Sequence, residues 1–174
     1  MARQTQRTVR IFCADRNRSG RSVSCLVSHL LTNQDTMIKI ALIAHDDMKA
    51  DMVSFVTKRL EFFNREDVEI CATGTTGKFL RFAGIEKVQA LLSGPKGGDA
   101  QIAAMVATGE IDAVIFFRDP LDAHPHEPDV QMLMRVCDVH QTPLATNYVS
   151  AKLVLDWFRI PENLKNWEER KNGE

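Results

Sequence analysis

Residues 38–47, IKIALIAHDD, join a short apolar run to an imidazole and two carboxylates. Three later apolar runs end in a similar way: VEICA (68–72) leads into TGTTG, residues 90–92 lead into SGPKGGD, and AVIFF (113–117) leads into RDP. In an open parallel α/β sheet, ligands bind at the carboxyl ends of the strands. Four such ends here carry phosphate-binding, acidic and imidazole groups, which indicates an enzyme that acts on a small phosphorylated molecule.

Helix-like segments alternate with these runs, and residues 143–146 (PLAT) form a fifth run. Residues 48–63 carry apolar side chains at helical spacing and predict the first helix. Five βα units with short connections predict a doubly wound, parallel, five-stranded sheet in a single Rossmann-like α/β domain. The later helices are expected to begin at glycine or capping positions: after Gly77, near Asp99, at a cap on Asp129 and at a cap on Ser150.

The composition is that of an ordinary soluble protein of one domain, with 174 residues, 44% hydrophobic and 26% charged. A net charge of −1 gives no support for nucleic acid or an anionic membrane as a partner. No apolar run approaches the roughly 20 residues that cross a bilayer. The cysteines form no CxxC motif and no zinc spacing, which favours a reducing cytoplasm over a disulfide framework. They are Cys13, Cys25, Cys71 and Cys137.

Residues 1–36 differ from the rest of the chain in charge. They hold six Arg, no Lys and two Asp, a net charge of +4, so the other 16 basic and 21 acidic residues give −5. This composition is similar to that of an organellar transit peptide, but an extension upstream of Met37 is the simpler interpretation. We expect a disordered extension over residues 1–36 and the folded domain over residues 37–174.

His45, Asp46 and Asp47 lie where the first strand gives way to a helix. An Asp at this place can simply cap the helix and complement its dipole. Lys49 lies four residues after His45 and therefore shares a helix face with it. A lysine at a helix N-terminus opposes the dipole unless an anion binds there. The segment is thus either a capped helix start or part of an anion site.

The turn Thr73-Gly74-Thr75-Thr76-Gly77 offers three hydroxyl groups and two flexible glycines. Backbone N–H groups and hydroxyls at a strand-to-helix turn can cradle a phosphate. The turn is not a Walker A loop, because the frame that ends in Gly-Lys-Ser/Thr is absent. An ordinary glycine turn is the alternative.

A second glycine-rich turn, residues 93–99 (SGPKGGD), ends in the carboxylate of Asp99. Asp99 can cap the helix that follows. A cap, however, needs no three glycines before it, whereas close approach of the backbone to a ligand does need them.

A long loop stiffened by prolines follows the fourth strand and holds Arg118, Asp119, His124, His126 and Asp129. The prolines lower the entropy cost of holding side chains in place. His-x-His with nearby acids is compatible with a metal ion, but no further His or Cys lies at a metal-ligand spacing, so we expect no metal. A surface loop without function is the remaining alternative.

Together these segments resemble the methylglyoxal synthase family over roughly residues 38–150. The Gly-Pro-x-Gly-Gly-Asp and Pro-His-x-Pro-Asp pieces, in this order and spacing, are highly specific. The resemblance implies conversion of dihydroxyacetone phosphate to methylglyoxal and inorganic phosphate through an enediolate, without a metal or organic cofactor. The matching pieces are ALIAHD (41–46) with Lys49, ATGTTG (72–77), LSGPKGGD (92–99), FFRDPL (116–121), HPHEPDV (124–130) and PLATN (143–147).

The resemblance also implies a role for individual residues. Asp99 is expected to be the general base that removes the proton beside the carbonyl. His126 is expected to lie at the substrate oxygens, to polarise the carbonyl and to move a proton. Asp46, Asp119 and Asp129 are expected to be supporting acids. The residues expected to contact the substrate or its phosphate are His45, Lys49, Thr73, Gly74, Thr75, Thr76, Ser93 and Gly94, together with His126.

By the same resemblance we expect a homo-oligomer, a hexamer in the family, and inorganic phosphate as product and inhibitor. A basic residue near the C-terminus often reaches a neighbouring subunit's phosphate site in the family. Arg159 and Arg170 are the candidates here, and neither aligns well enough to be assigned.

Two other functions stay open. The same fold serves as a non-catalytic allosteric module in carbamoyl phosphate synthetase, and a cyclohydrolase-like relative would act on a purine nucleotide. A module needs the Thr-Gly turn but not Asp99 with His126, so the presence of both favours the enzyme.

Overall fold

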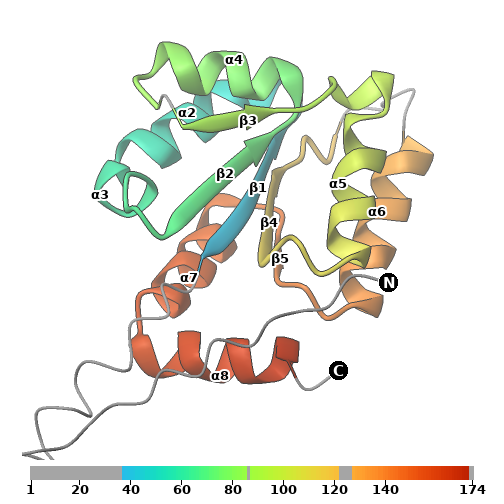
Figure 1. Ribbon diagram of the computed structural model, residues 1–174. Coiled ribbons are helices and arrows are strands. Elements are labelled where there is room, and N and C mark those ends of the chain that lie inside the picture. Colours follow the sequence, from blue (N-terminus) through green and yellow to red (C-terminus); the bar gives the residue numbers. More distant parts are fainter. Residues whose placement is uncertain (1–36, 86, 122–126, 173–174) are drawn as a thin grey trace, which may run out of the picture. The chain divides into compact units, whose positions relative to one another are not determined.

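Five parallel strands form one sheet in the order β3-β2-β1-β4-β5 (Figure 1). The structure is a computed structural model that describes residues 37–85, 87–121 and 127–172. These findings confirm the predicted parallel sheet in a single α/β domain. The strands are β1 Ile38–Ala44, β2 Val68–Ala72, β3 Val88–Ala90, β4 Ala113–Phe117 and β5 Leu144–Ala145.

Helices cover both faces of the sheet, because the central strands are apolar at successive positions. In β1, Ile40 and Leu42 face one core, and Ala41 and Ile43 face the other. Helices α2, α3, α4 and α7 pack on the first face. Helices α5 and α6 pack on the second, where they lie side by side in Figure 1. The helices are α2 Lys49–Thr57, α3 Leu60–Phe63, α4 Gly74–Phe82, α5 Gly98–Ala107, α6 Glu127–Val139, α7 Tyr148–Phe158 and α8 Pro161–Asn172.

The direction of winding changes between β1 and β4. From β1 the chain adds β2 and β3 on one side, and it then crosses to add β4 and β5 on the other. In doubly wound sheets, such a switch point opens a crevice outside the carboxyl ends of the strands, where ligands bind. Here His45 follows β1 and Arg118 follows β4, so polar side chains lie on both sides of the switch point.

Two predicted elements have different bounds. The third strand spans Val88–Ala90 and not the predicted residues 90–92, because the backbone of Leu92 bonds to groups outside the sheet. The helix predicted over residues 48–63 is interrupted between α2 and α3. At this break the Arg59 guanidinium donates to the carbonyl of Phe55 at 3.0 Å, and the Thr57 hydroxyl donates to the carbonyl of Val53 at 2.7 Å. Side chains that bond to the last carbonyls compete with continuation of the helix.

Three predicted helix starts also shift. Helix α4 begins at Gly74, so the Thr-Gly turn forms its first turn and does not precede it. Helix α6 begins at Glu127, which places Asp129 inside the first turn and makes the prediction of an Asp129 cap wrong. The cap of α7 is Asn147, whose side chain accepts from the N–H of Ser150 at 3.0 Å. Ser150 is the third residue of that helix and completes a capping box.

Helix α8 is an element that the sequence analysis did not predict. Its docking depends on Asp112, a buried carboxylate just before β4. Asp112 accepts hydrogen bonds from the N–H of Lys39, the indole of Trp167 and the ammonium of Lys171, each at 2.8 Å. Leu164 and Trp167 of α8 pack against the core, and most of the other residues of the helix are polar, so it lacks a strong apolar pattern.

Some predictions fall on residues outside the described ranges. These are the N-terminal extension, residues 1–36, and the loop segment with His124 and His126. For the helices that the structure describes, none combines the length and apolar character that a membrane span requires.

Candidate active site

The backbone of the loop after β4 holds the imidazole of His45. The N–H of Asp119 donates to His45 Nδ1 at 3.1 Å, and the N–H of His45 donates to the carbonyl of Phe117 at 3.0 Å. The ring is only 6% exposed and lies edge-on to Phe116, with ring centroids 5.0 Å apart. Because Nδ1 accepts a hydrogen bond, the neutral imidazole carries its proton on Nε2. His45 is therefore arranged to donate from Nε2.

Lys49 is the first residue of α2, and its ammonium group lies in a partly apolar environment. Its side chain is 10% exposed, whereas that of its ion-pair partner Asp46 is 92% exposed. The ammonium nitrogen lies 5.8 Å from the centre of the Phe79 ring of α4. A lysine is almost never buried without a compensating charge, and here the carboxylate that pairs with it faces water. The arrangement suits a second anion beside Lys49.

The Thr-Gly turn presents the N-terminal end of α4. Thr73 and Thr76 are buried and their hydroxyl oxygens lie 3.2 Å apart, while Thr75 is exposed. The side chain of Thr73, the N-cap residue, does not cap the helix. The first N–H groups of a helix have no partner within the helix, so an uncapped first turn can bind an anion such as phosphate.

Asp99 lies in the first turn of α5, and its side chain is buried (1% exposed). It is not the cap of that helix, because Gly97 occupies the N-cap position. Gly94 packs directly against its carboxylate. A Cβ atom at Gly94 would lie 2.9 Å from Asp99 Oδ2, so glycine is needed for the carboxylate to keep this place.

The other two glycines of the turn have structural reasons that involve no ligand. Gly97 has φ +95°, in the left-handed region that favours glycine. Gly98 lies so close to Leu92 that a Cβ atom would come within 2.1 Å of the Leu92 carbonyl oxygen. These reasons account for Gly97 and Gly98 without a ligand, so close approach to a ligand stays a prediction for the turn.

The backbone of Leu92 connects the Thr-Gly turn to the helix that carries Asp99. Its carbonyl accepts from the N–H of Gly74 at 2.9 Å, and its N–H donates to Gln101 Oε1 at 2.9 Å. Gln101 was not among the predicted site residues. Its position two residues after Asp99 does not distinguish it from any exposed glutamine, so the sequence carried no signal for this contact.

Contacts between four elements join the predicted residues at the carboxyl edge of the sheet. His45 is bonded to the loop after β4, Lys49 lies against α4, and α4 is bonded to the loop before α5. The predicted residues that this network includes are His45, Asp46, Lys49, Thr73, Gly74, Thr76, Ser93, Gly94, Asp99 and Asp119.

The acidic residues of the last loop are less directly connected. The carboxylate of Asp119 accepts from the N–H of Leu121 at 2.9 Å and so stabilises its own loop. Asp129 lies in the first turn of α6, where a carboxylate complements the helix dipole. The Arg118 guanidinium donates to the sulfur of Met134 in α6, with 2.9 Å between Nη1 and Sδ.

The same segments match known proteins. Residues 51–146 match the family model described as an MGS-like domain. A methylglyoxal synthase from Carboxydothermus hydrogenoformans is 60% identical over 119 residues, which are 68% of this chain and 97% of that protein. The chain belongs to the methylglyoxal synthase family. A methylglyoxal synthase from Thermus thermophilus is 51% identical over 123 residues, which are 71% of this chain and 96% of that protein.

A solved structure of the family supports the fold. The crystal structure of methylglyoxal synthase from Elizabethkingia anophelis NUHP1 aligns with a TM-score of 0.64 and 42% sequence identity. The alignment covers 69% of this chain and 78% of that one.

The two cysteines that the structure describes are poor candidates for a catalytic nucleophile. Burial raises the pKa of the Cys71 thiol, in β2, to about 11, and burial likewise raises the pKa of Cys137, in α6, to about 11. Both thiols are therefore protonated near neutral pH, and a protonated thiol is a poor nucleophile. Among the described residues, no three His, Cys, Asp or Glu side chains gather as a metal site would require.

Proposed function

We propose that the protein is a methylglyoxal synthase, a lyase that converts dihydroxyacetone phosphate to methylglyoxal and inorganic phosphate. One observation carries this proposal: a buried carboxylate, Asp99, lies one loop away from an uncapped helix N-terminus of phosphate-binding type. The relatives named methylglyoxal synthase, at 51–60% identity, support the same activity.

The first step is removal of a proton from the carbon beside the ketone by Asp99. Gly94 and the first turn of α5 enclose this carboxylate, so little water competes with the substrate for it. The product of this step is an enediolate, which carries negative charge on oxygen.

Hydrogen-bond donors that already point at this oxygen lower the activation free energy of proton removal, because they need no reorganisation during the reaction. His45 can donate from Nε2, since Nδ1 accepts a hydrogen bond from the backbone N–H of Asp119. By the family resemblance His126 acts at the substrate oxygens and moves a proton. The same intermediate arises in triosephosphate isomerase, which also uses a carboxylate and a neutral histidine.

The second step breaks the C–O bond to phosphate and leaves the enol of methylglyoxal, which becomes methylglyoxal when Asp99 returns its proton to the terminal methylene carbon. Lys49 and the N–H groups of Thr75 and Thr76, in the first turn of α4, stabilise the charge that develops on the leaving group, while the N–H of Gly74 donates to the Leu92 carbonyl. The hydroxyl of Thr75 and the backbone of Ser93 and Gly94 complete the phosphate contacts. By the family resemblance, Asp46, Asp119 and Asp129 are supporting acids, and Asp46 does this through its ion pair with Lys49. The reaction needs no redox change, so side chains suffice without a cofactor.

The family resemblance extends the proposal beyond the single chain. On that basis the protein is a cytoplasmic homohexamer, and inorganic phosphate is both its product and an inhibitor. Sedimentation of the purified full chain tests the assembly, and added phosphate in the activity assay tests the inhibition.

The decisive experiment incubates the full chain with dihydroxyacetone phosphate and follows methylglyoxal and free phosphate together. We expect both in equal amounts, with turnover at least roughly a thousandfold lower in Asp99→Asn, while that variant still binds phosphate. Phosphate without methylglyoxal would identify a phosphatase instead. Bound phosphate with neither product would favour the allosteric module, and near-wild-type activity of Asp99→Asn would remove this residue as the base.

A further inference from the structure

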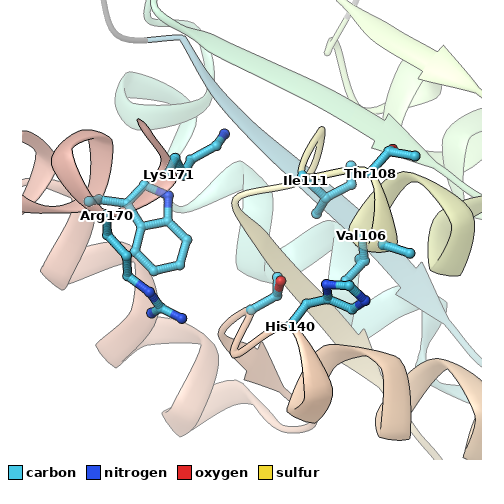
Figure 2. Close-up of a pocket in the computed structure, with 10 residues that line it drawn as sticks. Val106, Thr108, Ile111, His140, Arg170 and Lys171 are labelled. Atoms are coloured by element: carbon cyan, nitrogen blue, oxygen red, sulfur yellow. The ribbon is translucent and has the colours of Figure 1, made fainter. Parts of the chain in front are cut away.

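A pocket lies at the amino edge of the sheet, whereas the proposed active site lies at the carboxyl edge. Figure 2 shows the residues that line this pocket. It has a volume of about 310 Å³, and its walls are the C-terminal ends of α5 and α6, the residues just before β4 and β5, and helix α8. Ligand pockets usually measure roughly 300–1,000 Å³, so this one suits a small molecule. Among the residues that line it, Arg170 was a candidate for a neighbouring subunit's phosphate site, and none is among the residues proposed above for the active site of this chain.

Arg170, on α8, is held at this pocket by two neighbours. Its Nη2 donates to Gln141 Oε1 at 2.7 Å, and its guanidinium carbon lies 5.1 Å from the centre of the Trp167 ring. Figure 2 shows Arg170 on one side of the pocket and His140 on the other. A guanidinium group has five N–H donors in a fixed fork, and Gln141 accepts from one of them. The fork can therefore bind a carboxylate while it stays attached to Gln141.

The backbone of Gln141 has a conformation that usually favours glycine. Its φ of +52° lies in the left-handed region that favours glycine. Among the residues that the structure describes, no other non-glycine residue has a positive φ. The equivalent position after α5 is Gly109, with φ +71°. Gln141 thus keeps a side chain at a place where glycine is preferred, and that side chain orients Arg170.

The charges around the pocket restrict the class of ligand. Lys171 is paired with the buried carboxylate of Asp112, whereas Gln141, the partner of Arg170, is neutral. Glu110 bonds to Thr108 at the rim but is exposed, so solvent screens its charge. The C-terminal ends of α5 and α6 add partial negative charge. With His140 counted as neutral, Arg170, Lys171 and Asp112 leave one positive charge, which fits a monoanion better than a phosphate dianion.

The other side chains of the wall are partly polar and partly apolar. Thr108, His140 and Thr142 are polar, whereas Val106, Ile111 and the Trp167 ring are apolar. A ligand with its charged group at Arg170 can place an apolar body against the Trp167 ring, beside Val106 and Ile111.

We propose that this pocket is a second ligand site, which binds a small organic monocarboxylate with an apolar body. Arg170 binds the carboxylate, and Val106, Ile111 and the Trp167 ring contact the body. The site is separate from the proposed active site, so its occupancy is measured without reference to turnover.

Nuclear magnetic resonance of the ¹⁵N-labelled full chain tests the proposal, with benzoate as the probe. The reporter is the indole N–H of Trp167, which donates to Asp112 beside the pocket, and its signal is assigned from its loss in Trp167→Phe. We expect a saturable shift with benzoate and at least roughly tenfold weaker binding of benzamide, the neutral analogue, because a charge-assisted hydrogen bond is lost. No saturable shift, or equal affinity for both probes, would overturn the proposal.

Two variants of the pocket and one control sharpen the test. Arg170→Gln should weaken benzoate binding at least roughly tenfold. Arg159→Gln, which removes an arginine that pairs with Asp156 outside the pocket, should leave binding unchanged. Gln141→Gly relieves the left-handed backbone but cannot hold Arg170, so we expect an equal or higher Tm together with weaker binding. Unchanged benzoate affinity in Arg170→Gln would refute the assignment.

Inorganic phosphate distinguishes the two possible kinds of oxyanion. We expect phosphate to leave the Trp167 signal unshifted at concentrations at which benzoate saturates the pocket. A phosphate-induced shift that Arg170→Gln abolishes, without a benzoate response, would show that the carboxylate class is wrong.

Discussion

At the scale of single residues, the contact between Gly94 and Asp99 defines the proposed base. The carboxylate keeps its place because position 94 has no side chain. Gly94 was expected to bind phosphate, and the structure adds this second reason for a glycine there. The position of the proposed base therefore depends on the absence of a side chain at Gly94.

Substitution of Gly94 tests that contact. In Gly94→Ala the new Cβ would lie 2.9 Å from Asp99 Oδ2, so the carboxylate must move. We expect kcat to fall roughly ten- to a hundredfold, because catalysis is sensitive to misplacement of about 1 Å. Steady-state kinetics with dihydroxyacetone phosphate give the measurement. Gly97→Ala is the control: its left-handed backbone costs stability, about 1–2 kcal/mol, but a Cβ there would meet none of the described residues, Asp99 included. Equal losses of kcat in both variants would argue against a specific effect.

The two threonines of the turn should differ in their effects. Thr76 is buried and shares a hydrogen bond with Thr73, so Thr76→Val should lower the free energy of unfolding by about 1–3 kcal/mol. Thr75 is exposed, so Thr75→Val should leave stability within about 0.5 kcal/mol and weaken phosphate binding. Urea unfolding and phosphate titration separate the two quantities. Unchanged phosphate affinity in Thr75→Val would exclude its hydroxyl from the phosphate contacts.

At the scale of elements, the loop between β3 and α5 connects the two halves of the proposed mechanism. The backbone of one residue, Leu92, bonds to Gly74 in α4 and to Gln101 in α5. Movement of this loop would therefore displace the phosphate turn and the helix of Asp99 together. Gln101 acts on the reaction through the loop and is a positioning residue.

Removal of the Gln101 acceptor should lower kcat modestly. Gln101→Leu loses a hydrogen bond whose net value is about 0.5–1.5 kcal/mol, which corresponds to roughly a three- to tenfold change in rate. Gln101→Glu keeps an oxygen acceptor and should restore most of the activity. Gln131→Leu, which breaks a comparable contact with Glu127 on α6, is the matched control. If Gln101→Glu were as slow as Gln101→Leu, the hydrogen bond would not be the cause.

At the scale of the whole molecule, the core that α5 and α6 form with the sheet contains two buried thiols. The raised pKa values of Cys71 and Cys137, both about 11 against an ordinary value of 9.0, mean that the folded state holds these protons more tightly than the unfolded state. Their contribution to stability is complete below about pH 9 and is lost as the pH rises through about 11.

Alkaline unfolding should reveal this linkage. Each thiol contributes up to about 3 kcal/mol across this window, because a change of one in pKa corresponds to about 1.36 kcal/mol. We expect the urea midpoint to fall between about pH 9 and pH 11, and to fall less in the double variant Cys71→Ala, Cys137→Ala. An equally steep decline in that variant would assign the pH dependence to other groups.

Much of this organisation could be predicted from local patterns. The apolar runs of β1, β2 and β4 match the structure residue for residue, because buried parallel strands read as short continuous hydrophobic stretches. The glycine and threonine turns could be placed at the carboxyl edge of the sheet because they directly follow apolar runs in the sequence. These features depend on neighbours along the chain, so composition and spacing suffice to find them.

Other features depend on residues far apart in sequence, and no local pattern contains them. Helix α8 is mostly polar and docks through Asp112, which lies 55 positions before Trp167. The bond between Asp119 and His45 spans 74 positions, yet it sets which nitrogen of the imidazole carries the proton. The positions of the strands and the identities of the chemical groups thus follow from patterns of neighbouring residues in the sequence. Their orientation, the closeness of Gly94 to Asp99 and the pocket under α8 arose only when distant segments packed together.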